Sequence, residues 1–120
     1  MTIQESAEMY LETILILSKK TDNVRSIDIS NHMHFSKPSV SRAMKNLSNA
    51  DYIEIDGNGH ITLTEKGLSV AKKIYERHRM LTEYFMKIGV SPQTAEEDAC
   101  RIEHVISDET FEAIKKRLGD

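Results

Sequence analysis

Three side chains near the C-terminal end have the types and spacing of metal ligands. Cys100, Glu103 and His104 fall at positions i, i+3 and i+4 of a predicted helix, and therefore share one helix face. A thiolate, a carboxylate and an imidazole each donate a lone pair, and from one face they can reach a common point without straining the backbone. The spacing therefore predicts half of a divalent-metal site.

One helix cannot close a coordination sphere, so the remaining ligands must come from other helices. Met9 and Glu12 are again three residues apart on a predicted first helix, and His78 lies on a predicted long helix. Each residue alone has an ordinary structural interpretation: cysteine and methionine commonly fill cores, and glutamate and histidine are commonly solvated. The metal interpretation rests on their joint occurrence.

A second group of residues has the composition of a DNA-reading helix. Ser36 is a good N-cap, Pro38 is tolerated in the first helical turn, and the predicted helix runs to about Asn49. Its early turns are rich in hydroxyl and basic side chains, and the predicted DNA-binding residues are Ser36, Lys37, Pro38, Ser39, Ser41, Arg42 and Lys45. Arg42 can form two parallel hydrogen bonds with guanine or phosphate. The alternative is an ordinary solvated helix face.

The surrounding sequence predicts the elements that position these groups. Apolar spacing indicates helices over residues 4–20, 27–34, 36–49, 65–88, 92–105 and 108–118, with Ile27, Ile29 and Met33 facing inward on the second. Alternating residues around the turn at 56–59 indicate a two-stranded hairpin, or wing, in which Asn58 and His60 could touch DNA. We predict a mainly α (α+β) fold: a winged helix-turn-helix DNA-binding domain over residues 1–70, and an α-helical dimerisation and metal-binding domain over residues 71–120.

Composition excludes several other classes of protein. The 120 residues carry a net charge of −3 and contain one cysteine, which excludes an intramolecular disulfide and fits the cytoplasm. No apolar run is long enough to span a membrane. The charged residues within 18–47 are mostly basic, six against two acidic, and those within 91–120 are mostly acidic, eight against four basic, which suits contact with an anion at one end. No phosphate-binding loop or catalytic constellation is present, so we expect neither an enzyme nor a small-molecule substrate.

Three segments resemble the diphtheria-toxin-repressor family of metal-dependent repressors, which has iron- and manganese-sensing branches. The segments are AEMYLETI at residues 7–14, Arg77-His78-Arg79, and DACRIEHVISDE at residues 98–109. The resemblance covers essentially the whole chain. It implies a homodimer that binds double-stranded operator DNA when metal is bound, and the SH3-like third domain of longer members is not expected.

The resemblance also implies ligands. Iron-type members use residues matching Met9, Cys100, Glu103 and His104, and their second site uses a histidine matching His78. At two other second-site positions this chain has Thr82 and Glu96, so a second site of His78 and Glu96 stays open. Manganese-type members have carboxylates at the positions of Met9 and Cys100 and add residues matching Glu12 and His78. This chain is a hybrid of the two branches.

The two sulfur ligands soften the site relative to manganese-type members. We therefore expect Fe(II) as the physiological metal, with Mn(II) next, while Co(II), Ni(II) and Zn(II) would also bind. A cation joining the first helix to the Cys100 segment would set the separation of two recognition helices near one DNA turn, about 34 Å. The alternatives are a metal-independent winged-helix regulator with Cys100 as a core residue or redox switch, and a metal-storage or structural zinc protein.

Overall fold

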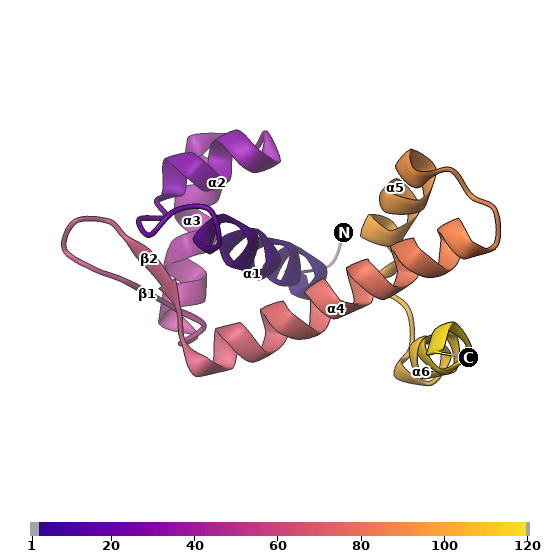
Figure 1. Cartoon of the computed structure of the whole chain (residues 1–120). Coiled ribbons are helices and arrows are strands. Elements are labelled where there is room, and N and C mark those ends of the chain that lie inside the picture. Colours follow the sequence, from indigo (N-terminus) through magenta and orange to yellow (C-terminus); the bar gives the residue numbers. More distant parts are fainter. Residues whose placement is uncertain (1–2, 120) are drawn as a thin grey trace. The chain divides into compact units, whose positions relative to one another are not determined.

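The computed structural model describes residues 3–119, which form six helices and a two-stranded antiparallel sheet (Figure 1). In chain order the elements are α1 (Ile3–Ser18), α2 (Ser26–Met33), α3 (Lys37–Asn49), β1 (Ile53–Ile55), β2 (Ile61–Leu63), α4 (Glu65–Lys87), α5 (Pro92–Ile102) and α6 (Asp108–Gly119). The mainly helical fold predicted from the sequence is confirmed. The chain divides into two compact units between Lys72 and Lys73, within α4. The predicted boundary between domains 1–70 and 71–120 stays a prediction.

In the first unit, α1, α2 and α3 share one apolar core. Its fully buried side chains include Leu11 and Ile14 of α1, Ile29 of α2, and Val40 and Met44 of α3. These positions recur at helical spacing, so each helix turns an apolar stripe inward and leaves its polar face exposed.

The predicted inner face of α2 is wrong at one position. Ile27 is 39% exposed, whereas Ile29 and Ser30 are buried and Met33 is half-buried. Residues 29, 30 and 33 lie on one side of a helix, and residue 27 lies about 200° from residue 29 at 100° per residue. An eight-residue helix buries only one narrow face, so Ile27 remains on the outside.

The turn between α2 and α3 is held by two short side chains. His34 ends α2 in the left-handed conformation, with φ 60°. The Ser30 hydroxyl then donates to the Phe35 carbonyl at 2.6 Å. Ser36 caps α3 by accepting a hydrogen bond from the Ser39 amide at 3.3 Å, as predicted from the sequence. These contacts fix a helix-turn-helix.

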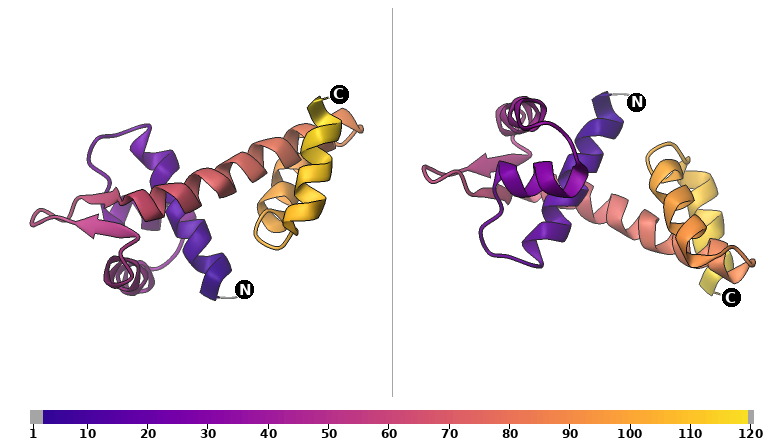
Figure 2. Two further views of the ribbon diagram at one scale, coloured as in Figure 1. Left: turned by 90° about the horizontal axis from the view of Figure 1, so that it is seen from below. Right: turned by 90° about the horizontal axis from the view of Figure 1, so that it is seen from above.

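The wing is a short hairpin in which Ile53 pairs with Leu63 and Ile55 with Ile61 (Figure 2). The Asp56 carboxylate closes its turn by accepting hydrogen bonds from the amides at positions 58 and 60, at 2.8 and 2.9 Å. Strand β2 is anchored on its other side, where the Ile61 amide donates to the Val24 carbonyl at 2.7 Å. The wing is therefore tied to the segment before α2.

The start of α4 packs against the chain just before β1. The Thr64 hydroxyl accepts a hydrogen bond from the Gly67 amide at 3.1 Å and donates to the Asp51 carbonyl at 2.6 Å. A side chain at Gly67 has no room, because a Cβ atom there would lie 2.0 Å from the Tyr52 carbonyl oxygen. The close approach of α4 to Tyr52 therefore requires glycine.

We predict that Gly67→Ala destabilises the protein by about 1–3 kcal/mol, because the added carbon meets backbone that must shift. Urea unfolding followed by circular dichroism measures the change. Gly57→Ala is the matched control: a Cβ there meets nothing within 4 Å, so unfolding should be nearly unchanged. Equal stability of the two variants would contradict this account of the packing.

The second unit contains α5, α6 and the part of α4 from Lys73 onward. Ile74, Leu81, Ala95, Ala99 and Phe111 are buried. Gly89, with φ 107°, follows the end of α4, and the Ser107 hydroxyl caps α6 by accepting a hydrogen bond from the Thr110 amide at 3.1 Å. No helix among residues 3–119 is both long and apolar enough to cross a membrane.

One predicted boundary is wrong in this unit. Helix α5 ends at Ile102 instead of Val105. The physical reason is a side chain from α4: Arg77 donates to the carbonyls of Glu103 and Ile106, at 3.3 and 2.9 Å. These carbonyls are thereby satisfied outside a helix, and the chain can turn toward α6.

Candidate functional site

A buried carboxylate lies at the centre of the candidate metal site. Glu103 follows the last residue of α5, and its side chain is 1% exposed. Its backbone still has helical angles, with φ −56° and ψ −27°, and its amide donates to the Ala99 carbonyl at 2.9 Å. Glu103 therefore extends the helical path by one residue. His104 already belongs to the following turn, so the prediction that all three donors share one helix is wrong in this detail.

Two imidazoles contact the two oxygens of this carboxylate. His78 Nδ1, from α4, lies 2.8 Å from Glu103 Oε2. His104 Nε2 lies 3.3 Å from Glu103 Oε1, and the His104 side chain is 6% exposed. Cys100 Sγ, from α5, lies 3.7 Å from His78 Nδ1. Four of the six predicted ligands therefore form one chain of contacts within the second unit.

The chemistry of these donors and the separations of three neighbouring pairs are those of metal ligands. Ligands bound at about 2.0–2.3 Å to one tetrahedral ion lie roughly 3–4 Å from one another. The neighbouring donor pairs here, at 2.8, 3.3 and 3.7 Å, are close to that range. Sulfur, imidazole nitrogen and carboxylate oxygen together suit a late first-row divalent cation.

His78 is a cation when no metal is bound. Hydrogen bonds to the Cys100 sulfur and to the Glu103 carboxylate raise the pKa of His78 from 6.5 to about 10, against partial burial, which lowers it. The imidazolium therefore supplies positive charge beside the buried carboxylate. A metal that binds through His78 must displace this proton, so metal binding should weaken as pH falls.

We predict that the metal-free protein holds His78 protonated across neutral pH. A raised pKa stabilises the fold most below pH 6.5, and this contribution disappears as pH rises through about 10. NMR titration of the imidazole carbons measures the pKa directly. Glu103→Gln should lower it by removing the charged partner.

The control for this titration is Glu83→Gln, which removes an exposed carboxylate lining the same shallow pocket as His78. Its effect on the His78 pKa should be small, because Glu83 makes no contribution to the shift. A titration midpoint near 6.5 in the unmodified protein would contradict the assignment.

Arg77 is a residue of this site that sequence reasoning did not assign. Its side chain is buried, and it reaches the turn that carries Glu103. The available signal was its position, since Ile74, Arg77 and Leu81 lie on one face of α4 and the two apolar members are buried. An arginine on an apolar helix face needs internal hydrogen-bond partners.

The two remaining predicted ligands lie on α1 in the first unit. Met9 is half-buried and Glu12 is almost fully buried. They are three residues apart and therefore neighbours on the helix surface. Their participation in metal binding stays a prediction.

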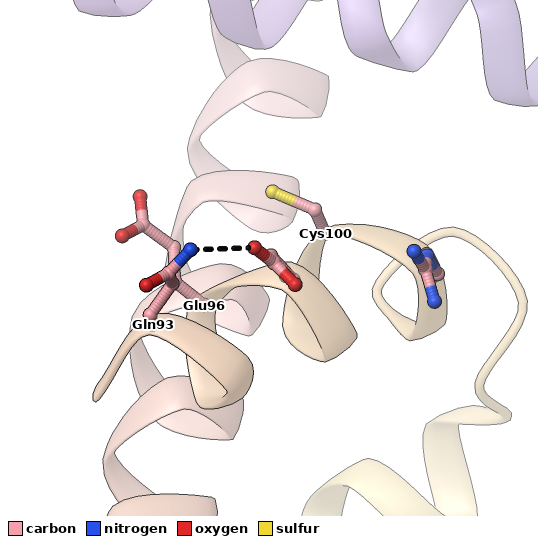
Figure 3. Close-up of a pocket in the computed structure, with 5 residues that line it drawn as sticks. Gln93, Glu96 and Cys100 are labelled. Atoms are coloured by element: carbon pink, nitrogen blue, oxygen red, sulfur yellow. Dashed lines mark hydrogen bonds between the residues drawn. The ribbon is translucent and has the colours of Figure 1, made fainter. Parts of the chain in front are cut away.

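The predicted second metal site also stays a prediction. Glu96 lies on an exposed face of α5 with Gln93 and Cys100 (Figure 3), beside a hydrogen bond from Gln93 Nε2 to Glu97 Oε1 at 3.3 Å. His78 lines a different pocket, with Thr82 among its neighbours. The Thr82 hydroxyl donates to the His78 carbonyl at 2.7 Å, within its own helix.

The exposure of Cys100 overturns one alternative interpretation. Its side chain lies at the surface of α5, so Cys100 is not a core residue. Exposure beside an imidazolium leaves the sulfur accessible as a ligand.

The predicted DNA-binding face of α3 is separated from the core. Lys37, Pro38, Ser41, Arg42 and Lys45 are exposed, whereas the apolar positions of the same helix are buried. The Ser36 hydroxyl donates to the Ser39 hydroxyl at 2.8 Å, so these two residues also stabilise the start of the helix. The arrangement leaves basic and hydroxyl groups available to a phosphate backbone or to base edges.

In the wing, His60 is partly committed to local contacts. Its Nε2 lies 3.1 Å from an Arg25 side-chain nitrogen, and its Nδ1 lies 3.4 Å from Asp56 Oδ2. Asn58 is exposed at the tip. A role for either residue in DNA contact stays a prediction.

Comparison with known families matches both parts of the chain. Residues 2–61 match the N-terminal DNA binding domain of iron dependent repressors, and residues 64–120 match their metal binding and dimerisation domain. An HTH-type transcriptional regulator of Methanocaldococcus jannaschii is 31% identical over 115 residues, covering 94% of this chain and 92% of the relative. The transcriptional regulator MntR of Escherichia coli O157:H7 is 30% identical over 112 residues, covering 93% of this chain and 72% of that protein.

Solved structures show the same fold. The manganese regulator SloR has a TM-score of 0.83 and 30% identity, and the match covers 99% of this chain. A manganese-dependent transcriptional repressor in complex with manganese has a TM-score of 0.86 and 24% identity, with 94% of this chain covered. The chain spans 55% and 52% of these two structures, respectively, so it matches about half of each.

Proposed function

We propose that this chain is a metal-dependent transcriptional repressor. The chain belongs to the iron-dependent repressor family, of the diphtheria-toxin-repressor and MntR type, and the proposal proceeds from that membership. In this proposal a homodimer loaded with a divalent cation binds operator DNA and controls genes of metal homeostasis. The observation that carries the proposal is the carboxylate of Glu103, buried between two imidazoles, one of which lies 3.7 Å from the cysteine sulfur of Cys100.

The residues assigned to the metal are those of this cluster, His78, Cys100, Glu103 and His104, together with Met9 and Glu12 of α1. When bound, the metal supplies concentrated positive charge for which these ligands compete with protons. Glu103 needs that charge most, because a buried carboxylate is costly without a cationic or hydrogen-bonding partner. Cys100 softens the donor set, and His78 and His104 provide nitrogen ligands that suit iron as well as zinc.

Within the first unit, an aromatic contact connects α1 to the start of α3, the predicted DNA-binding helix. Tyr10 follows Met9 on α1, and its ring meets Phe35 edge-on at a centroid distance of 6.0 Å. Phe35 immediately precedes Ser36, the cap of α3. A change in α1 on metal binding would therefore bear on the start of the recognition helix. The expected coupling is of ordinary allosteric size, about 1–3 kcal/mol.

Dimerisation is supported by apolar groups that the second unit leaves exposed. Ile88 and Val105 are 62% and 64% exposed, and Met86 at the end of α4 is also exposed. Burial against a second copy would remove this apolar surface from water. The family model matching residues 64–120 describes a dimerisation domain, which supports the same proposal.

The proposal is tested by fluorescence anisotropy with the protein's own promoter DNA, with Fe(II) under anaerobic conditions and with a chelator. We expect tight binding with metal and loss of binding with chelator, because metal shifts the population toward the DNA-competent dimer. Glu103→Gln should abolish the response to metal. Its matched control, Glu109→Gln, alters an exposed glutamate of α6 and should respond as the unmodified protein does.

Two outcomes would overturn the proposal. DNA binding that is equally tight with chelator would favour a metal-independent regulator. Metal binding without any specific DNA binding would favour a storage or structural role.

We propose Fe(II) as the physiological metal, with Mn(II) next, because two sulfur ligands replace the carboxylates of manganese-type sites. Cys100→Asp should therefore shift relative affinity from Co(II), a spectroscopic substitute for Fe(II), toward Mn(II) by about tenfold, because a hard carboxylate suits the harder Mn(II) better than a thiolate does. Competition titrations with a chelating dye measure both affinities.

Glu97→Gln changes an exposed carboxylate of the same helix, beside Cys100 in the same pocket, and serves as the control. Its ratio of Co(II) to Mn(II) affinity should stay close to that of the unmodified protein. An unchanged ratio in Cys100→Asp would show that the sulfur does not bind the metal.

A further inference from the structure

Arg77 makes an unusual set of contacts for an arginine in a helix. Its side chain is 6% exposed and comes from the residue directly before His78 on α4. One guanidinium nitrogen donates to both the Glu103 and the Ile106 carbonyls, and the other pairs with Asp108 at the start of α6. The guanidinium therefore joins α4 to both ends of the turn that connects α5 with α6.

These contacts fix the two sources of ligands relative to each other. Glu103 and His104 belong to the turn held by Arg77, and His78 belongs to the helix from which Arg77 extends. A turn after a helix has carbonyls without helical donors, and its conformation follows whatever donors it finds. Here the donor and one ligand are consecutive residues, so movement of the turn away from Arg77 would also separate Glu103 from His78.

Stability alone is a poor explanation for this arginine. Its Nε is buried and has no hydrogen-bond acceptor among residues 3–119. Leaving a buried donor unsatisfied typically costs about 1–3 kcal/mol. A different bridge already joins α4 to α6, since Lys115 Nζ lies 2.6 Å from Glu76 Oε1.

We propose that Arg77 is a positioning residue for the metal centre: it holds the Glu103–Ile106 turn against α4 so that the Glu103 carboxylate meets both His78 and His104, and it raises metal affinity without touching the metal. The inference rests on the proposed function, because it assigns Arg77 a role toward the same metal. Arginine is required because its planar fork reaches two carbonyls and a carboxylate together, whereas lysine offers one rotating ammonium.

The test uses Co(II), titrated into the full chain and followed by its thiolate-to-metal and ligand-field absorption. Arg77→Lys keeps the charge but loses the fork, and should lower Co(II) affinity about 10–100-fold, the usual effect of removing a residue that orients ligands. Asp108→Asn removes the negative charge that pairs with the Arg77 guanidinium and should cause a smaller loss of Co(II) affinity. Lys115→Met breaks the other bridge between α4 and α6 and should leave affinity within about twofold of the unmodified protein.

Hydrogen exchange of the metal-free variants provides a second measurement that does not depend on metal. Arg77→Lys should accelerate amide exchange around residues 103–106, whereas Lys115→Met should not. Co(II) affinity of Arg77→Lys within twofold of the unmodified protein would overturn the inference. If Arg77→Lys fails to fold, unchanged affinity in Asp108→Asn overturns it instead.

Failure of the unmodified protein to bind Co(II) would contradict the proposed function. In that case the exchange rates alone decide whether Arg77 holds the turn, and unchanged exchange in Arg77→Lys would overturn this part as well.

Discussion

The burial of the Glu103 carboxylate is the constraint around which the second unit is organised. A carboxylate with 1% exposure has lost nearly all its water and needs nearby donors or positive charge. His78 and His104 meet its two oxygens, and Arg77 holds the backbone carbonyl of the same residue. Without metal, the proton on His78 supplies charge at this centre, because the pKa of that histidine is raised to about 10. A divalent cation would supply it more strongly, so the arrangement that stabilises the metal-free centre also suits the metal ion that we propose.

The first unit holds one helix, α3, rigidly and leaves one face of it exposed. Helix α3 buries Val40 and Met44 and leaves Arg42 and Lys45 in solvent, so its orientation is fixed by packing and its basic groups are free to meet an anion. Caps at Ser36 and Thr64 and the closed turn at Asp56 fix the ends of the neighbouring elements. Membership of the repressor family agrees with these separate roles, because the family has an N-terminal domain that binds DNA and a second domain that binds metal and dimerises.

Most of the fold could be predicted because its signals are local. Ser36, Thr64 and Ser107 cap the helices that follow them, and each was recognisable from its own few neighbours. The end of α5 could not be predicted, because it depends on Arg77, more than 20 residues earlier in the chain. The prediction that Ile27 faces inward was wrong for another reason. Its apolar side chain was assigned to the core, although a short helix buries only one side.

The ligand set divides in the same way. The spacing of Cys100, Glu103 and His104 indicated the donors, but the meeting of His78 with Glu103 depends on tertiary packing that spacing alone does not specify. The sequence did not indicate a role for Arg77, because an arginine among charged neighbours in a helix is normally solvated. Its burial depends on the packing of α5 and α6 on α4.

X-ray absorption spectroscopy of the Fe(II)-loaded protein tests most directly the claim that this cluster binds the metal. The account predicts a mixed first shell, with sulfur at about 2.3 Å together with nitrogen and oxygen scatterers that include imidazole. Cys100→Ser should reduce the sulfur contribution, and the sulfur that remains is then assigned to Met9. A first shell of oxygen alone, with neither sulfur nor imidazole, would contradict the assignment of the metal to the Glu103 centre.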